Sequence, residues 1–109
     1  KLPSAARLRV DRPKVVGYLL SLSHPDGASK ARFFLGFGFQ ANKWEVFARA
    51  LRKHGRTHDV RAAVDSLHGT RYSIDGLLET PDGRNPRVRT VWVLAKRSNS
   101  PRLVTAYPI

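Results

Sequence analysis

Cysteine and methionine are both absent from this sequence of 109 residues. The absence of cysteine excludes disulfide bonds and thiolate metal sites as supports for the fold. An intact reading frame normally starts with methionine, whereas this chain starts with lysine, so we expect a piece of a longer protein. We expect that piece to be C-terminal, because the sequence ends directly after a strand-like run. Long apolar runs and a signal-peptide pattern are missing as well, so no membrane segment is expected.

Acidic residues are scarce. Eight Asp and Glu face 20 Lys and Arg, for a formal net charge of +12. Self-repulsion of this excess destabilises a compact state, so we expect a polyanionic partner, with a nucleic acid first among the candidates. The charge divides into +8 over residues 1–55 and +4 over residues 56–109, so it is spread over the fold and does not form a basic tail. The alternative is a generally basic surface without a specific partner.

Metal and nucleotide motifs are also lacking. The acidic residues are scattered, and the four histidines at positions 24, 54, 58 and 68 lack metal-ligand spacing. The sequence has no P-loop, no Gly-x-Ser-x-Gly elbow and no Gly-x-Gly-x-x-Gly motif. We therefore expect neither a metal site nor a cofactor.

Helix patterns occupy the first half of the chain. Hydrophobic residues make up 41% of the sequence, enough for one domain over residues 1–109. Asp11 precedes Arg12-Pro13 as a helix N-cap, Asn42 and Glu45 predict a capping box, and Gly55 predicts a helix end. The three predicted helices cover residues 12–22, 28–35 and 42–55. The third is expected to bury Trp44, Phe47, Ala48 and Leu51.

Strand patterns occupy the second half. Four strands are predicted: residues 59–65, a strand through Tyr72 and Ile74, residues 88–95 and residues 103–107. In the first of these, Val60, Ala62 and Val64 are expected to share the buried face. The run 88–95 is apolar on both faces, which is typical of a central strand. Helices followed by strands favour an α+β fold, with N-terminal helices packed on a roughly four-stranded antiparallel β-meander.

RNA cleavage without a metal requires few groups. A base removes the 2′-OH proton, an acid protonates the departing 5′-oxygen, and cations stabilise the phosphorane between these steps. His24 lies in a turn six residues before Lys30, so the two could flank one phosphate. Alternatively, His24 only supports the turn and Lys30 is a solvated charge.

The strand 88–95 offers further candidates. Arg87 and Arg89 share one face, whereas Thr90 and Trp92 share the other. An arginine beside a sheet core can bind phosphate with two hydrogen bonds, or it can pair with an acid of a neighbouring strand such as Asp75.

In the last strand, Thr105 and Tyr107 project to one side. Their hydroxyls either act on a substrate or cap a solvated edge of the sheet. We expect Arg32, Arg87, Arg102 and Tyr107 to contribute to RNA binding.

Two blocks of the sequence resemble a family of small bacterial toxin-type domains. The first contains Tyr18-Leu19-Leu20, His24-Pro25-Asp26-Gly27, Lys30-Ala31, Phe33-Phe34 and Gly36-Phe37, and the second contains Thr80-Pro81-Asp82-Gly83-Arg84, Val88-Arg89-Thr90-Val91-Trp92 and Pro101-Arg102-Leu103-Val104-Thr105. Members are C-terminal toxin domains of polymorphic, contact-dependent or secretion-delivered proteins, and nuclease domains attached to phage head proteins. They are grouped with the barnase–EndoU–colicin–RelE (BECR) ribonucleases.

The resemblance implies metal-independent cleavage of cellular RNA, with tRNA as one candidate substrate. It also implies a cognate acidic immunity protein and delivery from a producing cell into the cytoplasm of a target cell. His24 would act as acid or base, Lys30 and Arg89 would stabilise the phosphorane, and Thr90 and Thr105 would position the substrate. We expect a monomer that does not act at a membrane. The alternative is a non-catalytic nucleic-acid-binding module, which would display exposed aromatic side chains for base stacking.

Overall fold

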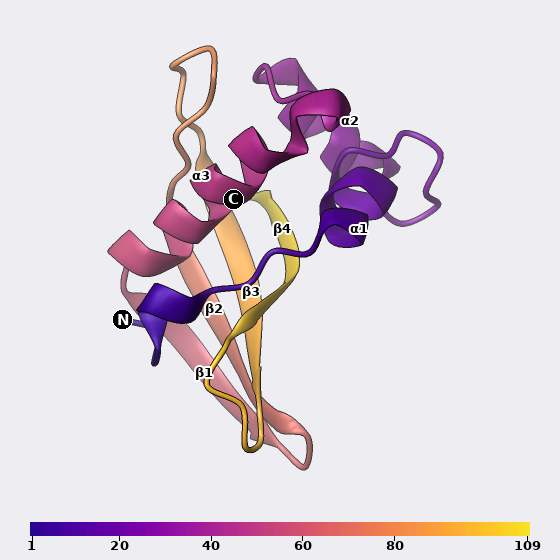
Figure 1. Cartoon of the computed structure of the whole chain (residues 1–109). Helices are drawn as coiled ribbons and strands as arrows, with labels where there is room; N and C mark the ends of the chain where they lie inside the picture. Colours follow the sequence, from indigo (N-terminus) through magenta and orange to yellow (C-terminus); the bar gives the residue numbers. More distant parts are fainter.

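The computed structural model describes residues 1–109. The helical segments come first: η1 (Ala5–Arg7), α1 (Arg12–Lys14), η2 (Val15–Leu19), α2 (Ala28–Gly36), η3 (Ala41–Lys43) and α3 (Trp44–Thr57). The strands follow: β1 (Val60–Ser66), β2 (Gly69–Leu77), β3 (Arg87–Ala95) and β4 (Arg102–Pro108). They form one antiparallel sheet in the order β1-β2-β3-β4, which confirms the predicted α+β fold and its β-meander (Figure 1).

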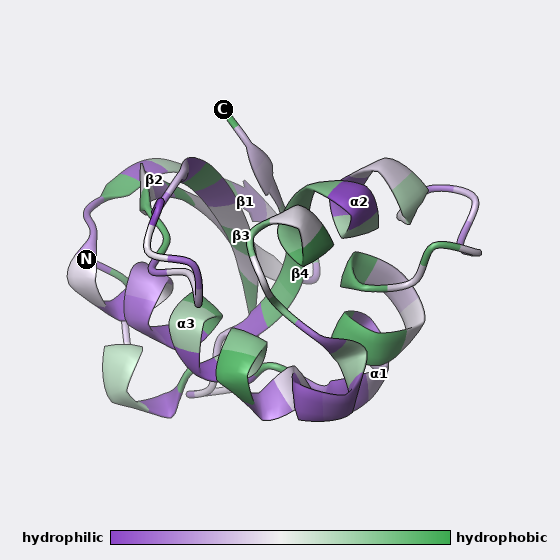
Figure 2. Cartoon of the chain, turned by 90° about the horizontal axis from the view of Figure 1, so that it is seen from above, coloured by the Kyte–Doolittle hydropathy of each residue, from purple (hydrophilic) through white to green (hydrophobic).

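Helix α3 covers one face of the sheet, and α1 and α2 lie to the side, next to β4 (Figures 1 and 2). Strand β3 pairs with both β2 and β4, so the prediction that this apolar run is a central strand is confirmed. Its residues Val88, Thr90 and Trp92 face α3 and are fully buried, whereas Arg87 on the opposite face is exposed. Each helix falls short of the length or the hydrophobicity that a membrane span requires.

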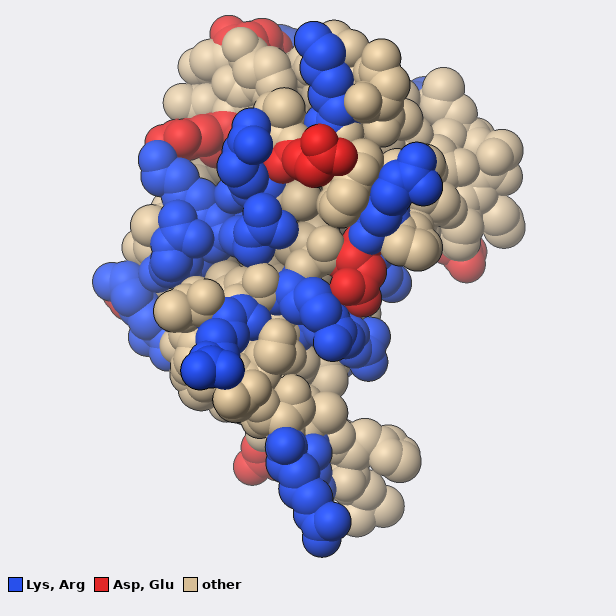
Figure 3. Space-filling view, in the orientation of Figure 1, with Lys and Arg blue, Asp and Glu red and all other residues tan.

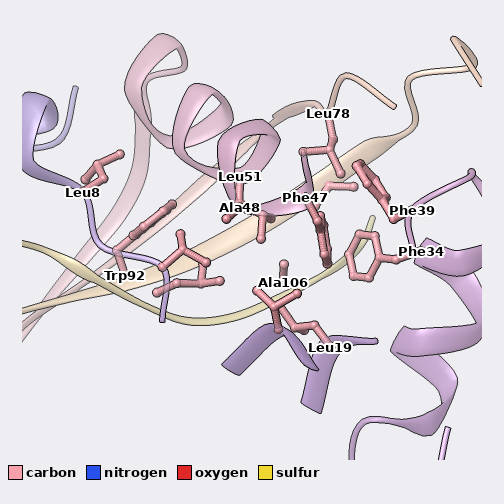
Figure 4. Packing of buried hydrophobic residues seen from close by; sticks show 14 of the residues in the cluster. Leu8, Leu19, Phe34, Phe39, Phe47, Ala48, Leu51, Leu78, Trp92 and Ala106 are labelled. Carbon is pink, nitrogen blue, oxygen red and sulfur yellow. The ribbon is translucent and has the colours of Figure 1, made fainter. Parts of the chain in front are cut away.

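A cluster of 17 buried residues forms the core between α3, the N-terminal helical segments and the sheet (Figure 4). The ring centroids of Phe39 and Phe47 are 4.4 Å apart, and those of Phe34 and Phe47 are 4.7 Å apart. Each of these rings buries a large apolar area at the contact, and this burial holds α2 against α3. Helix α2 also packs beside β4, so the turn that precedes α2 lies close to the last strand.

Helix α3 differs from its prediction at both ends. It begins at Trp44, directly after η3, and no side chain caps its first turn, so the predicted capping box of Asn42 and Glu45 is wrong. Trp44 is half-buried at the margin of the core. At the other end the helix continues through Gly55 to Thr57. Gly55 is needed within the helix because its missing side chain leaves room for the indole of Trp92: a Cβ there would lie 2.8 Å from Trp92 Cζ2.

The first predicted helix is shorter than expected. Asp11 is the N-cap residue as predicted, but its carboxylate lies 3.4 Å from Arg9 Nε and does not cap the helix. After α1 the chain widens into the π-type turn η2, in which the N–H of Leu20 donates to the carbonyl of Val15. This turn places Tyr18 beside β4.

Strand β1 is the exposed edge of the sheet. A register irregularity falls between Val60 and Ala62, so Val60 pairs with Ile74 while Ala62 pairs with Ser73. The predicted common face of Val60, Ala62 and Val64 is therefore wrong, because the extra residue reverses the alternation. Val64 is 62% exposed as a result.

Candidate active site at the β4 side of the sheet

The face of the sheet that points away from α3 carries the first part of the site. Alternation along β3 puts Arg89 and Val91 on this face. The strand register aligns Arg89 with Tyr107 on β4, and Val91 with Thr105. Val91 is only 5% exposed although it lies outside the core cluster, so neighbouring side chains cover it on this face.

Arg89 is held in place by Asp75 of β2. Its Nε and Nη2 atoms donate to the two carboxylate oxygens at 2.6 and 2.8 Å. Arg61 Nε lies 3.3 Å from the same carboxylate, and the guanidinium of Arg89 lies over the ring of Tyr107. The hydrogen bonds from Arg89 lower the pKa of Asp75 against the opposing effect of its burial. The alternative that Arg89 pairs with Asp75 is thus confirmed, and it fixes the guanidinium on this face.

Tyr18 is the centre of a polar cluster at the β4 side of this face. Its hydroxyl lies 3.1 Å from Thr105 Oγ1, and either oxygen can donate. The ring of His24 meets the ring of Tyr18 edge-on, with centroids 4.9 Å apart. Lys14 and Lys30 place their ammonium groups 5.1 and 5.3 Å from the centroid of the Tyr18 ring. The structure therefore brings His24, Lys30 and Thr105 together around a tyrosine that the sequence did not single out as a site residue.

The turn before α2 fixes His24. The backbone N–H groups of Asp26 and Gly27 donate to His24 Nδ1 at 3.0 and 3.1 Å. In the neutral ring the proton therefore lies on Nε2, which is left as a donor. Gly27 is required here, because a Cβ would lie 2.5 Å from the carbonyl oxygen of Tyr18. His24 thus supports the turn through one nitrogen and presents an N–H with the other.

The surroundings of Tyr18 lower the pKa of its hydroxyl. Partial burial alone would raise the pKa of the phenol. The hydrogen bond with Thr105 and the nearby positive charges of Lys30 and Lys14 outweigh burial and lower the pKa from its ordinary value. Lys30 is itself oriented by its bond to the carbonyl of Asp26, at 3.4 Å. A phenol with a lowered pKa beside free donors is suited to proton transfer.

Thr90 lies on the opposite face of the sheet and is fully buried. Its Oγ1 accepts a hydrogen bond from Trp92 Nε1 at 2.8 Å and bonds with His54 Nδ1 at 2.9 Å. The other nitrogen of His54 bonds with the carbonyls of Val88 and Gly76. The prediction that Thr90 positions a substrate is therefore wrong, because α3 and its buried histidine enclose it.

The remaining predicted RNA-binding residues lie on the surface, outside the Tyr18 cluster. Arg87 and Arg102 are exposed on the same sheet face as Arg89, at its two ends. Tyr107 is half-buried under Arg89, and Arg32 is exposed on α2. The structure does not bring these four residues to one point, so they extend a basic surface around the cluster. No three His, Asp or Glu side chains converge anywhere in the structure.

Sequence reasoning missed Tyr18 as a site residue. It lies among Val15, Val16, Leu19 and Leu20, which gives it the spacing of a core residue. Only its place at the start of the block that carries His24 and Lys30 pointed to the site. Its role depends on the π-type turn η2, which the apolar pattern does not encode.

Comparison with known proteins finds a solved structure with a similar fold and a family model that matches the sequence. A chain of a contact-dependent growth inhibition toxin–immunity protein complex from Klebsiella pneumoniae 342 has a similar structure, with a TM-score of 0.71. The match covers 92% of this chain and 98% of that chain at 17% sequence identity, so the likeness is one of fold. No curated protein sequence matches. The family model described as "Domain of unknown function (DUF6883)" matches residues 1–109, and the chain belongs to this family.

Proposed function

We propose that this chain is a toxin-type domain that cleaves RNA without a metal ion, in the manner of the BECR ribonucleases. The observation that carries the proposal is the cluster of Tyr18, His24, Lys30 and Thr105 beside a strongly basic sheet face. Three of these four residues, His24, Lys30 and Thr105, are also candidates for RNA cleavage on the sequence alone. The cluster supplies a proton acceptor, two proton donors and positive charge within one site.

In the proposed reaction the phenolate of Tyr18 takes the proton of a 2′-OH group. The 2′-oxygen then attacks the adjacent phosphorus, and the bond from phosphorus to the 5′-oxygen breaks. The ammonium of Lys30 gives a proton to the departing 5′-oxygen, and the Tyr18 hydroxyl returns a proton to the Lys30 amine. The products are a 2′,3′-cyclic phosphate and a 5′-hydroxyl.

The other groups would stabilise charge in this reaction. The Nε2–H of His24 donates to an oxygen of the phosphorane, a donor role that follows from its tautomer. Thr105 orients the Tyr18 hydroxyl. Arg89 is fixed by Asp75 and pairs with Tyr107, two residues along β4 from Thr105. From this position it would bind a neighbouring phosphate.

The toxin context is supported by the fold. The structural neighbour belongs to a complex of a contact-dependent growth inhibition toxin with its immunity protein. We infer that this chain likewise acts after transfer from one bacterium into the cytoplasm of another, and that a cognate immunity protein protects the producing cell. An acidic immunity protein would complement the net charge of +12.

Incubation with total cellular RNA in EDTA tests the proposal. The wild-type chain is expected to give discrete fragments, and His24→Ala and Lys30→Ala are each expected to lower the cleavage rate by about 10²–10⁴-fold. His68→Ala and Lys96→Ala are matched controls, because they remove a histidine and a lysine from exposed positions in turns between strands. Intact RNA that is only retarded in a salt-dependent way would contradict the proposal and indicate a nucleic-acid-binding module.

A further inference from the structure

We propose that the outward face of α3 is a second RNA-docking surface, which holds the phosphate backbone of a long RNA whose reacting bond lies at Tyr18. This inference rests on the proposed function, because it takes RNA as the ligand. The surface, called here the α3 stripe, consists of Arg49, Arg52, Lys53 and Arg56. Their spacing of three, four and seven residues places them on one side of the helix. Figure 3 shows basic side chains gathered over α3.

The fold itself does not require this charge. Phe47, Ala48 and Leu51 anchor α3 to the core from its other side. On the stripe, Arg49–Lys53 and Arg52–Arg56 are like-charged pairs at a spacing of four, and each destabilises a helix by about 0.2–0.5 kcal/mol. A helix that concentrates repelling charges on its solvent side fits an anionic partner that neutralises them.

Most of the stripe is free to bind an anion. Lys53 donates to Glu79 at 2.7 Å. Glu79 is the only acidic residue that forms an ion pair with the stripe. Arg49, Arg52 and Arg56 make no ion pair and no side-chain hydrogen bond. Arg49 forms no ion pair even though Glu45 precedes it by one helical turn. Three guanidinium groups therefore remain to bind phosphate oxygens.

The stripe also forms one wall of a groove. The groove has a volume of about 550 Å³, and Glu79, Thr80 and Pro81 form the opposite wall. Arg49 and Arg56 are about 10 Å apart along the helix axis, a distance that covers on the order of three phosphates of one strand. A groove with a line of cations along it matches a sugar–phosphate backbone in both shape and charge.

The lining of the groove favours RNA over an acidic protein. A protein–protein interface normally has an apolar centre with a polar rim. Here Val46 is the only exposed large hydrophobic residue of the groove, at 36% exposure. Five of the ten residues that line the groove are charged, and four of these five are Lys or Arg, so the lining offers a nucleic-acid backbone more partners than it offers the apolar centre of a protein interface.

The two RNA contacts lie on opposite sides of the sheet. Helix α3 packs on the face that carries Trp92, whereas Thr105 and Tyr18 meet on the other face. We therefore expect a dinucleotide bound at Tyr18 to leave the α3 stripe unoccupied. The stripe should therefore select long RNA over short fragments, and short cleavage products should leave the domain readily.

Binding of a fluorescently labelled folded RNA tests this inference. Every protein carries His24→Ala, so the RNA stays intact and the measurement does not depend on catalysis. The α3 variant is Arg49→Gln/Arg56→Gln, and the matched control is Lys96→Gln/Arg97→Gln, which removes the same charge from an exposed turn. We expect the α3 variant to bind about tenfold more weakly. We also expect its slope of log affinity against log salt to fall by about 1.4–1.8, whereas a dinucleotide is bound equally by all.

Equal affinities of the α3 variant and the control would overturn the inference, whether the α3 stripe serves an acidic protein or no partner. Thermal unfolding of both variants shows that each is folded. Cleavage by the His24-intact chain is measured separately, so RNA that is bound through α3 but never cut would refute the proposed function and leave the α3 stripe standing.

Discussion

Replacement of Tyr18 by phenylalanine separates its chemical role from its structural one. The variant keeps the ring and its contacts with His24, Lys14 and Lys30, and it loses only the hydroxyl. The lost bond to Thr105 is partly exposed, so the free energy of unfolding should fall by no more than about 1 kcal/mol. Loss of a general base, in contrast, should lower the cleavage rate by about 10²–10⁴-fold.

Thr105→Val is the matched variant, because it removes the same hydrogen bond and leaves the phenol in place. Burial raises the pKa of Tyr18, and the bond from Thr105 leads the opposing effects that lower it. Without that bond the pKa rises, so a smaller fraction of Tyr18 is deprotonated at a given pH. The increase of rate with pH should therefore move to higher pH in Thr105→Val and be absent in Tyr18→Phe.

The assay is the initial rate of cleavage of a labelled RNA across the pH range, with thermal unfolding as the measure of stability. Equal losses of rate in the two variants, with an unshifted pH dependence in Thr105→Val, would refute the assignment of Tyr18 as the base. That result would instead show that the tyrosine only supports Thr105.

Three further predictions concern stability, measured by urea unfolding. Thr90→Val leaves the buried nitrogen of His54 and the indole N–H of Trp92 without a partner, so it should destabilise by about 1–3 kcal/mol per group and leave the cleavage rate of the folded chain unchanged. Gly55→Ala places a Cβ 2.8 Å from Trp92, so it should destabilise the folded chain by about 1–3 kcal/mol. Gly36→Ala is its control: no atom lies near the new Cβ, so this change should be neutral or stabilising. Burial and the nearby charge of a second histidine lower the pKa of His54, so the unfolded chain binds a proton that the folded chain does not. The free energy of unfolding should therefore fall as the pH drops below about 6.5, by at most about 1.4 kcal/mol per pH unit. A free energy of unfolding that stays constant from pH 7 to 5 would contradict the buried neutral ring.

The order of helices and strands was predictable because local patterns encode it. The apolar run Val88–Ala95 favours a strand with a neighbour on each side, and β3 pairs with both β2 and β4. Alternation along the same strand correctly separated Arg89 from Thr90. Which of the two faces α3 covers depends on packing between distant segments, so the burial of Thr90, for which the resemblance implied a role in positioning the substrate, was not predictable from the sequence.

The candidate site was only partly predictable for the same reason. The turn at His24 and the helix at Lys30 are local features that the sequence predicted, and the structure places both residues beside Tyr18. The pairing of Arg89 with Asp75 remained open, because it depends on the register of two strands that are separated by a long loop. Tyr18 was missed because the π-type turn that aims it at Thr105 arises from tertiary packing among apolar neighbours.

The most direct test of the central claim compares one RNA oligonucleotide with its 2′-deoxy counterpart in EDTA. The proposed reaction requires the 2′-oxygen as the nucleophile. We predict that the wild-type chain cuts the RNA into fragments that end in a 2′,3′-cyclic phosphate, as read by mass spectrometry, and leaves the 2′-deoxy strand intact. Cleavage of both strands, or of neither, would contradict the account.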